Sequence, residues 1–142
     1  VTERTPLFTE RVGVKLENDK VKSRLLHWQK VCISACEQSH RTKIPIINSP
    51  KKIEDWIQNA SAQKKVMLNP KGKTQISTLK NNNTIVDISL LIGPEGGFSA
   101  REVQIAKNSE FDQISLGPRI LRTETAPIVA ISIFQSIWGD IH

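Results

Sequence analysis

Apolar residues recur along the chain with a helical spacing in two long segments. Between residues 19 and 39 they fall at steps of three and four, which predicts a long amphipathic helix. Its stripe consists of Val21, Leu25, Trp28, Cys32 and Cys36, widened by Leu26 and Ile33. A last helix is expected from about 123 to 138, with apolar residues on more than one face. Such a helix must be covered on two sides, and a symmetric partner subunit is the economical second cover.

Shorter apolar runs predict strands at 44–47, 66–68, 85–92 and 113–116. A turn signal at 69–72 (Asn-Pro-Lys-Gly) ends the strand at 66–68, and a second one at 81–83 (Asn-Asn-Asn) leads into the strand at 85–92. A short helix is expected after Ser49, with Pro50 at its first position. Ser99 and Glu102 form a capping box before a helix that runs to about Asn108. Strands and helices that alternate with short connections predict an α/β fold, with a mostly parallel sheet and helices on both faces.

Two strand-to-loop transitions mark the candidate site. Residues 90–102 run from an apolar strand through a glycine turn into a capped helix, and residues 114–125 leave a strand in a similar way. Open α/β sheets bind ligands at the carboxyl ends of neighbouring strands. We therefore expect the active site where these two loops leave the sheet.

The loop Gly93-Pro94-Glu95-Gly96-Gly97 has the wrong chemistry for phosphate. Its spacing matches neither common phosphate-binding glycine motif, and Glu95 places a negative charge where a pyrophosphate would lie. A ligand with hydroxyl groups or a positive centre suits it better, and S-adenosylmethionine, with a ribose, an adenine and a sulfonium, fits this description. The alternative is a tight turn that the fold requires, with Glu95 simply solvated.

The second loop, residues 116–122, offers an apolar wall and backbone polar groups to a flat heterocycle. Arg119 and Arg122 would then face a nucleic-acid substrate. The alternative for both arginines is a surface salt bridge to a residue such as Glu124.

Composition narrows the class of protein. The 142 residues include 38% hydrophobic ones and fit one globular domain, and no apolar run approaches the roughly 20 residues that cross a membrane. A soluble, cytoplasmic protein is expected. The net charge of +6 favours a polyanionic partner, although an ordinary solvated surface remains the alternative. Cys32 and Cys36 lack metal-ligand spacing, so we expect reduced core cysteines and no metal. The histidines show no relation to a nucleophile, so the substrate is expected to bring its own.

Three stretches carry a family resemblance. Residues 91–99 (Leu-Ile-Gly-Pro-Glu-Gly-Gly-Phe-Ser), 116–126 (Leu-Gly-Pro-Arg-Ile-Leu-Arg-Thr-Glu-Thr-Ala) and 35–41 (Ala-Cys-Glu-Gln-Ser-His-Arg) with Pro45 resemble the RsmE family. Its members are bacterial 16S ribosomal RNA uridine-N3 methyltransferases of the SPOUT superfamily. Residues 5–11 (Thr-Pro-Leu-Phe-Thr-Glu-Arg) also resemble a segment of this family.

The resemblance implies a SPOUT-type α/β fold with a C-terminal trefoil knot, S-adenosylmethionine bound in the knot, and an obligate homodimer. It also implies that residues 1–142 form a SPOUT methyltransferase domain that lacks the N-terminal PUA-like domain and the first strand and helix of the catalytic domain. The residues implied to line the cofactor pocket are Leu68, Asn69, Gly93, Pro94, Glu95, Gly96, Gly97, Leu116, Gly117, Ile120, Leu121, Arg122, Thr123 and Ala126.

The implied substrate is 16S ribosomal RNA of the small ribosomal subunit, methylated at N3 of a specific uridine. Loss of the N3 proton leaves an anion spread over two carbonyl oxygens. Arg122, together with Arg41 from the long helix, would donate to those oxygens, and Glu95 would orient an arginine or accept the proton. Two alternatives stay open: a non-catalytic RNA-binding or ribosome-assembly module, and a related knotted enzyme that methylates another RNA position.

Overall fold

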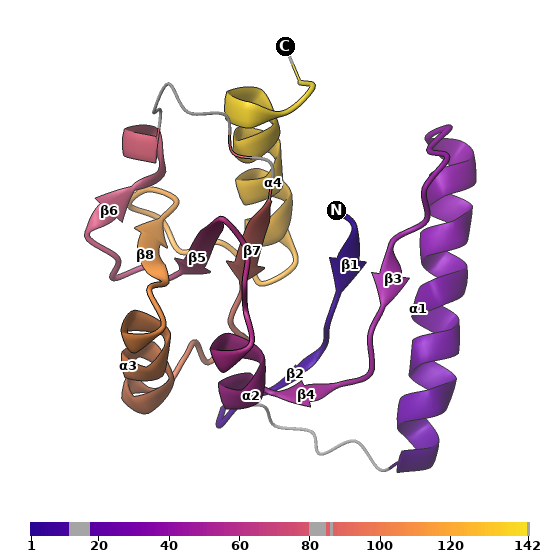
Figure 1. The fold of residues 1–142 in the computed structure, drawn as a ribbon, viewed down its shortest axis with the longest axis horizontal. Helices are drawn as coiled ribbons and strands as arrows, with labels where there is room; N and C mark the ends of the chain where they lie inside the picture. Colours follow the sequence, from indigo (N-terminus) through magenta and orange to yellow (C-terminus); the bar gives the residue numbers. More distant parts are fainter. Residues whose placement is uncertain (12–17, 80–84, 86, 142) are drawn as a thin grey trace. The chain divides into compact units, whose positions relative to one another are not determined.

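The chain divides into two compact units in a computed structural model that describes residues 1–11, 18–79, 85 and 87–141. One unit comprises Val1–Phe8 with Val12–Ile53, and the other comprises Thr9–Arg11 with Glu54–His142. Figure 1 shows the order of their helices and strands. Every strand pairing described in either unit is parallel, which confirms the expected α/β class with mostly parallel sheets.

The first unit consists of one long helix and two short strand pairs. Helix α1 spans Asn18–Gln38, as predicted, and contacts β3 (Ile46–Ile47). Strand β1 (Glu3–Arg4) pairs with β3, and β2 (Leu7–Phe8) pairs with β4 (Lys51–Lys52). The Gln29 side chain ties α1 to the β3 segment, because it donates to the carbonyl of Pro45 and accepts from the backbone N–H of Ile47, both at 3.3 Å.

The short helix after Ser49 begins later than predicted. Helix α2 spans Ile53–Gln58, so the prediction that Pro50 occupies its first position is wrong. The reason lies in a distant pairing: Lys51 donates its backbone N–H to the carbonyl of Pro6 at 3.1 Å and lies opposite Leu7 in β2. Residues 51 and 52 are therefore held in an extended conformation, and the helix starts where this pairing ends.

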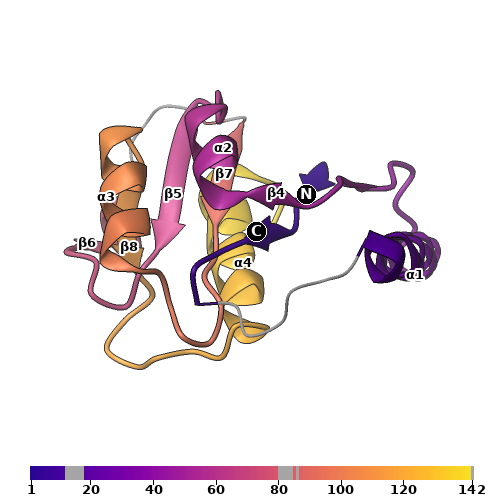
Figure 2. The ribbon, with the colours of Figure 1, turned by 90° about the horizontal axis from the view of Figure 1, so that it is seen from below.

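The second unit contains a four-stranded sheet in the order β6-β8-β5-β7. Strand β5 spans Lys64–Leu68, β6 Thr74–Gln75, β7 Ile88–Leu91 and β8 Asp112–Ser115, and Figure 2 shows β5 between β8 and β7. The predicted strand at 66–68 is confirmed, β8 begins one residue earlier than expected, and β7 covers only part of 85–92. Strand β6 and the 3-10 helix η1 (Ile76–Leu79) have no counterpart in the prediction. The turn expected at 81–83 lies outside the described residues.

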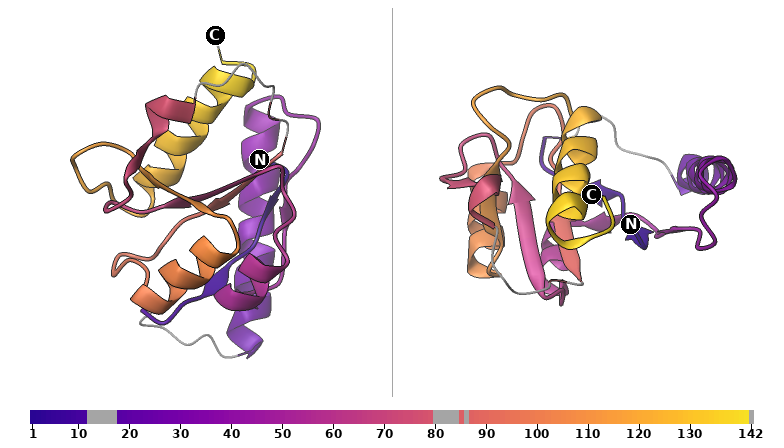
Figure 3. Two further views of the ribbon diagram at one scale, coloured as in Figure 1. Left: turned by 60° about the vertical axis from the view of Figure 1, so that its left-hand side comes forward. Right: turned by 90° about the horizontal axis from the view of Figure 1, so that it is seen from above.

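Helices cover both faces of this sheet (Figure 3). Helix α4 (Thr125–Trp138) lies on one face and α3 (Ala100–Asn108) on the other. The core beneath α4 is formed by Val66, Leu68, Ile114, Ala130 and Phe134. Because alternate residues of a strand face opposite sides, the buried Met67 and Leu91 point to the α3 face. Within the described part of the chain, no helix is long and apolar enough to cross a membrane.

Candidate functional site

Three neighbouring strands end at the same edge of the second unit's sheet. In the parallel register, Met67 of β5 lies opposite Leu91 of β7, and Leu68 lies opposite Ile114 of β8. The backbone N–H of Asn69 donates to the carbonyl of Ile114 at 2.9 Å. The predicted loops after β7 and β8 therefore leave the sheet on either side of the turn that follows β5, at the edge where open sheets bind ligands.

The turn after β5 is shaped by the Asn69 side chain. Its amide nitrogen donates to Gln113 Oε1 at 3.0 Å, and its amide oxygen accepts from the backbone N–H of Lys71 at 3.0 Å. The turn predicted at 69–72 is confirmed, since the Gly72 N–H donates to the Asn69 carbonyl at 2.8 Å. The family resemblance implies that Leu68 and Asn69 line the pocket here. The Leu68 side chain packs in the core, and both the oxygen and the nitrogen of the Asn69 side-chain amide form hydrogen bonds within the protein.

Backbone conformation and close packing explain two of the glycines in the loop after β7. The Gly97 N–H donates to the Pro94 carbonyl at 2.8 Å and closes a turn in which Gly97 has a φ of 67°, a conformation that favours glycine. A Cβ at Gly93 would lie 3.1 Å from the ring of Phe98. Glu95 is exposed and forms no hydrogen bond or ion pair among the described residues. The tight-turn interpretation therefore explains the glycines and leaves the carboxylate of Glu95 available.

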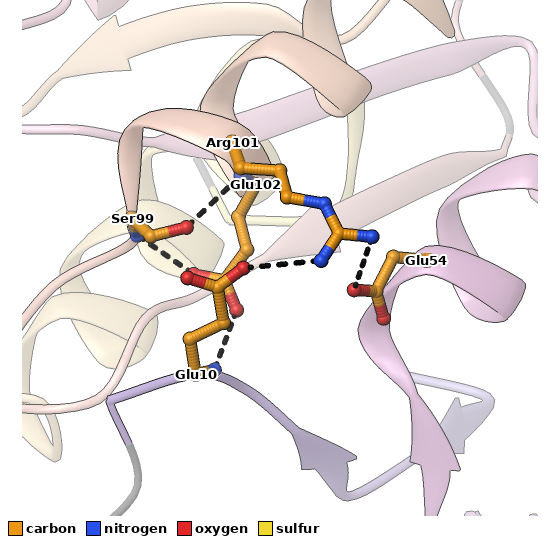
Figure 4. A network of polar contacts seen from close by, with 5 residues as sticks. All are labelled: Glu10, Glu54, Ser99, Arg101 and Glu102. Carbon is orange, nitrogen blue, oxygen red and sulfur yellow. Dashed lines mark hydrogen bonds and ion pairs between the residues drawn. The ribbon is translucent and has the colours of Figure 1, made fainter.

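Helix α3 begins directly after this loop with the predicted capping box, which is confirmed (Figure 4). Ser99 Oγ accepts from the Glu102 N–H at 3.1 Å, and Glu102 Oε2 accepts from the Ser99 N–H at 2.7 Å. The second carboxylate oxygen of Glu102 accepts from the backbone N–H of Glu10 at 2.8 Å. The Glu102 side chain is fully buried, and each of its two carboxylate oxygens accepts a hydrogen bond from a backbone N–H group.

The loop after β8 borders a cavity of about 460 Å³. Its lining consists of Gln75, Ile76, Ser115, Leu116, Gly117 and Pro118. Leu116 and Gly117 were predicted to line the cofactor pocket, and Gly117 has a φ of 111°. Gln75 and Ile76 were missed because residues 74–79 show neither an apolar period nor a glycine motif; their place follows from the pairing of Gln75 with Ser115.

The rest of this loop is largely exposed. Ile120 is 83% exposed, and the Arg122 side chain is 86% exposed, with its guanidinium 4.0 Å from Glu124 Oε1. The Arg122 carbonyl accepts from the backbone N–H groups of Thr125 and Ala126, both at 2.9 Å, where α4 begins. Of the other residues implied here, Leu121 and Thr123 are half-buried, and Ala126 packs against the core beneath α4.

Arg41 belongs to the first unit, so its approach to Arg122 stays a prediction. It is exposed, and its guanidinium donates to the carbonyl of Val1 at 3.4 Å. Of the clustered lysines, Lys64 forms an ion pair with Asp112 at 2.5 Å and Lys65 one with Glu110 at 3.7 Å, so both lysines have acidic partners within the chain. In the part of the chain that the structure describes, no cluster of three or more histidines, cysteines or carboxylates is suited to hold a metal ion.

Comparisons with known proteins identify the family. Residues 1–135 match the family model described as an RNA methyltransferase domain. Ribosomal RNA small subunit methyltransferase E of Buchnera aphidicola from Schizaphis graminum is 39% identical over 138 residues, which are 96% of this chain and 55% of that protein.

Two solved structures are similar along nearly the whole chain. A methyltransferase from Legionella pneumophila, solved with bound S-adenosylmethionine, has a TM-score of 0.93 and 38% identity, covering 99% of this chain and 57% of that one. Ribosomal RNA small subunit methyltransferase E from Neisseria gonorrhoeae, bound to the same compound, has a TM-score of 0.89 and 33% identity, covering 100% and 57%. The chain thus spans a little over half the length of these relatives. The chain belongs to the family that the RNA methyltransferase domain model describes, and the resemblance to the RsmE family that the motifs indicated is confirmed.

Proposed function

We propose that this chain binds S-adenosylmethionine at the carboxyl edge of the β6-β8-β5-β7 sheet and methylates N3 of a uridine in 16S ribosomal RNA. The observation that carries the proposal is the meeting of three parallel strand ends beside a cavity lined by Leu116 and Gly117. Relatives of the same family are named as ribosomal RNA methyltransferases, and two similar structures contain the methyl donor. A cytoplasmic location is part of the same proposal, and a ribosomal RNA substrate supports it.

The residues at this edge fit the proposed cofactor. The cavity of about 460 Å³ lies within the range of roughly 300–1,000 Å³ found for small-molecule sites. Ile76, Leu116 and Pro118 offer apolar contact to a heterocycle, and Gln75 and Ser115 add polar groups. Among the implied pocket residues, the exposed carboxylate of Glu95 supplies the negative charge that suits a sulfonium. When bound, S-adenosylmethionine supplies an electrophilic methyl group.

The chain's own residues then have to manage the N3 proton of the uracil. Arg122 is the first candidate to hold the anion that deprotonation leaves, because a guanidinium donates strongly to carbonyl oxygens that gain charge. Its present pairing with Glu124 is long and exposed, and such pairs contribute only about 0–1 kcal/mol, so the side chain is free to reorient. Arg41 is the second proposed donor, and Glu95 orients an arginine or accepts the proton.

A homodimer and a C-terminal trefoil knot belong to the same proposal, and family membership supports both. The surface of α4 supports the dimer in particular. Ala130 and Phe134 are buried, whereas Ile128 is 66% exposed and Ile131, Ile133 and Ile137 are only half-buried. An apolar helix face of this kind is covered economically by the same face of a second copy. Light scattering on the purified chain tests this part, and a monomer at micromolar concentration would contradict it.

Arg122→Ala separates the catalytic role from cofactor binding. We expect methylation of small ribosomal subunits to fall about a hundred-fold, as for loss of one donor to a developing oxyanion, with nearly unchanged affinity for S-adenosylhomocysteine. Arg101→Ala is the matched control, since Arg101 is an exposed arginine that lies outside this loop and pairs with Glu10 and Glu54. Equal losses of methylation and affinity would assign Arg122 to the pocket instead.

Two measurements distinguish the proposal from its alternatives. A non-catalytic RNA-binding module has no reason to bind S-adenosylhomocysteine, so calorimetry without a binding signal would refute the enzyme. Mass spectrometry of ribosomal RNA from a deletion strain locates the lost methyl group. Loss at a position other than uridine N3 in 16S ribosomal RNA would favour the related enzyme with another target.

A further inference from the structure

The glycine-rich loop is held by a segment that lies 85 residues earlier in the chain. Arg11 Nη1 donates to the carbonyl of Gly96 at 2.8 Å, and both residues belong to the second unit. We propose that Arg11 is a positioning residue that fixes the tip of this loop, so that Glu95 and the neighbouring backbone keep the arrangement that the cofactor needs. The inference rests on the proposed function, because it assigns the loop to the cofactor site.

The tip of the loop has little else to hold it. Its base is fixed on one side by the Phe98 ring, which lies against Gly93, and on the other by the capping box of Ser99 and Glu102. The central residues of the turn are an exposed glutamate and a glycine, neither of which contributes buried side-chain contacts. A charged donor on the Gly96 carbonyl therefore restrains the part of the loop that packing leaves free.

Arg11 is anchored through its neighbour Glu10, whose polar contacts are drawn in Figure 4. The backbone N–H of Glu10 donates to the buried Oε1 of Glu102 at 2.8 Å. The Glu10 carboxylate lies 3.6 Å from Arg101, which also lies 3.8 Å from Glu54. The two ion pairs of the exposed Arg101 are weak, whereas the hydrogen bond from Glu10 is partly buried and ends on the fully buried Glu102 side chain. Arg11 thus extends from a point that is tied to the first turn of α3, directly after the loop that it holds.

The test uses Arg11→Gln in the full chain, with S-adenosylhomocysteine as the probe in calorimetry. Loss of the charged donor should raise the Kd roughly three- to ten-fold. The melting temperature should change little, since the contact is exposed. Arg11→Lys, which keeps a cationic donor, should recover part of the affinity. With subunits as substrate, KM for S-adenosylmethionine should rise in Arg11→Gln while kcat stays within about two-fold.

Arg101→Gln is the matched control, because it removes a guanidinium from the same network without touching the loop. Its Kd should equal that of the unchanged chain. If the unchanged chain fails to bind the probe, the proposed function fails. If the unchanged chain binds and Arg11→Gln binds equally well, the positioning role is overturned. Equal weakening by Arg101→Gln, or a loss in Arg11→Gln that lysine does not partly restore, would also overturn it.

Discussion

Replacing Glu102 by alanine removes the group on which the start of α3 depends. Its carboxylate accepts the backbone N–H of Ser99 at 2.7 Å and that of Glu10 at 2.8 Å, and the side chain has no exposed surface. A donor left without a partner in a buried place loses about 1–3 kcal/mol. Ser99 is buried and the second bond is partly buried, so we expect the free energy of unfolding to fall by about 2–4 kcal/mol.

The loss is measured by urea unfolding of the full chain, with the slope m checked for constancy. Glu102→Gln keeps one acceptor oxygen and should lose about half as much. Ser99→Ala removes only the hydroxyl that caps the Glu102 N–H and should lose about 1 kcal/mol. If Glu102→Ala lowers the stability by less than about 1 kcal/mol, or by no more than Ser99→Ala, the two hydrogen bonds that the carboxylate accepts do not stabilise the start of α3.

Four further substitutions test three separate parts of the structure, each by chemical unfolding. Gly97→Ala should lower the free energy of unfolding by about 1–2 kcal/mol. The loss comes from the left-handed backbone at this position alone, since no atom lies within 4 Å of the added Cβ. Gly96→Ala should change the free energy of unfolding by less than about 0.5 kcal/mol. Similar values for the two would refute the backbone argument. Phe134→Ala should lose about 3–5 kcal/mol because the ring fills the core beneath α4, and a loss under 1 kcal/mol would contradict that packing. Lys64→Ala should lower the free energy of unfolding by less than about 1 kcal/mol, since the side chain of Asp112, its ion-pair partner, is 44% exposed; a greater loss would show that the pair is more than a surface contact.

The elements that local sequence signals specify were predicted well. The capping box is such a signal, because Ser99 and Glu102 are three residues apart and satisfy each other's backbone groups. Helix α1 follows from a stripe of apolar residues within one segment. In both cases the interactions that define the element lie close together in the sequence, so a pattern in a short window contains them.

The elements that depend on distant partners were missed. Strand β2 is two residues long and exists through its pairing with Lys51 and Lys52, more than forty residues later; the same pairing moved the start of α2. Gln75 reaches the cavity because it lies opposite Ser115 in the sheet. For the candidate site, the two glycine motifs indicated the edge of the sheet at which the cavity lies. Gln75 reaches this edge through its pairing with Ser115, and Arg11 reaches the glycine-rich loop through a long-range hydrogen bond; neither residue belongs to a motif.

The start of α3 also bears on the kind of ligand that this edge accepts. A helix N-terminus after a glycine loop ordinarily attracts phosphate, because its free N–H groups and its dipole favour an anion. Here the buried carboxylate of Glu102 already supplies that anion, and Ser99 caps one of the free N–H groups. A pyrophosphate bound at this loop would be repelled by the negative charge of Glu102 in the first turn of α3 and by that of Glu95 at the tip of the loop. Both carboxylates oppose an anionic ligand and favour a cationic one, so the electrostatics of the loop support a sulfonium over a nucleotide phosphate.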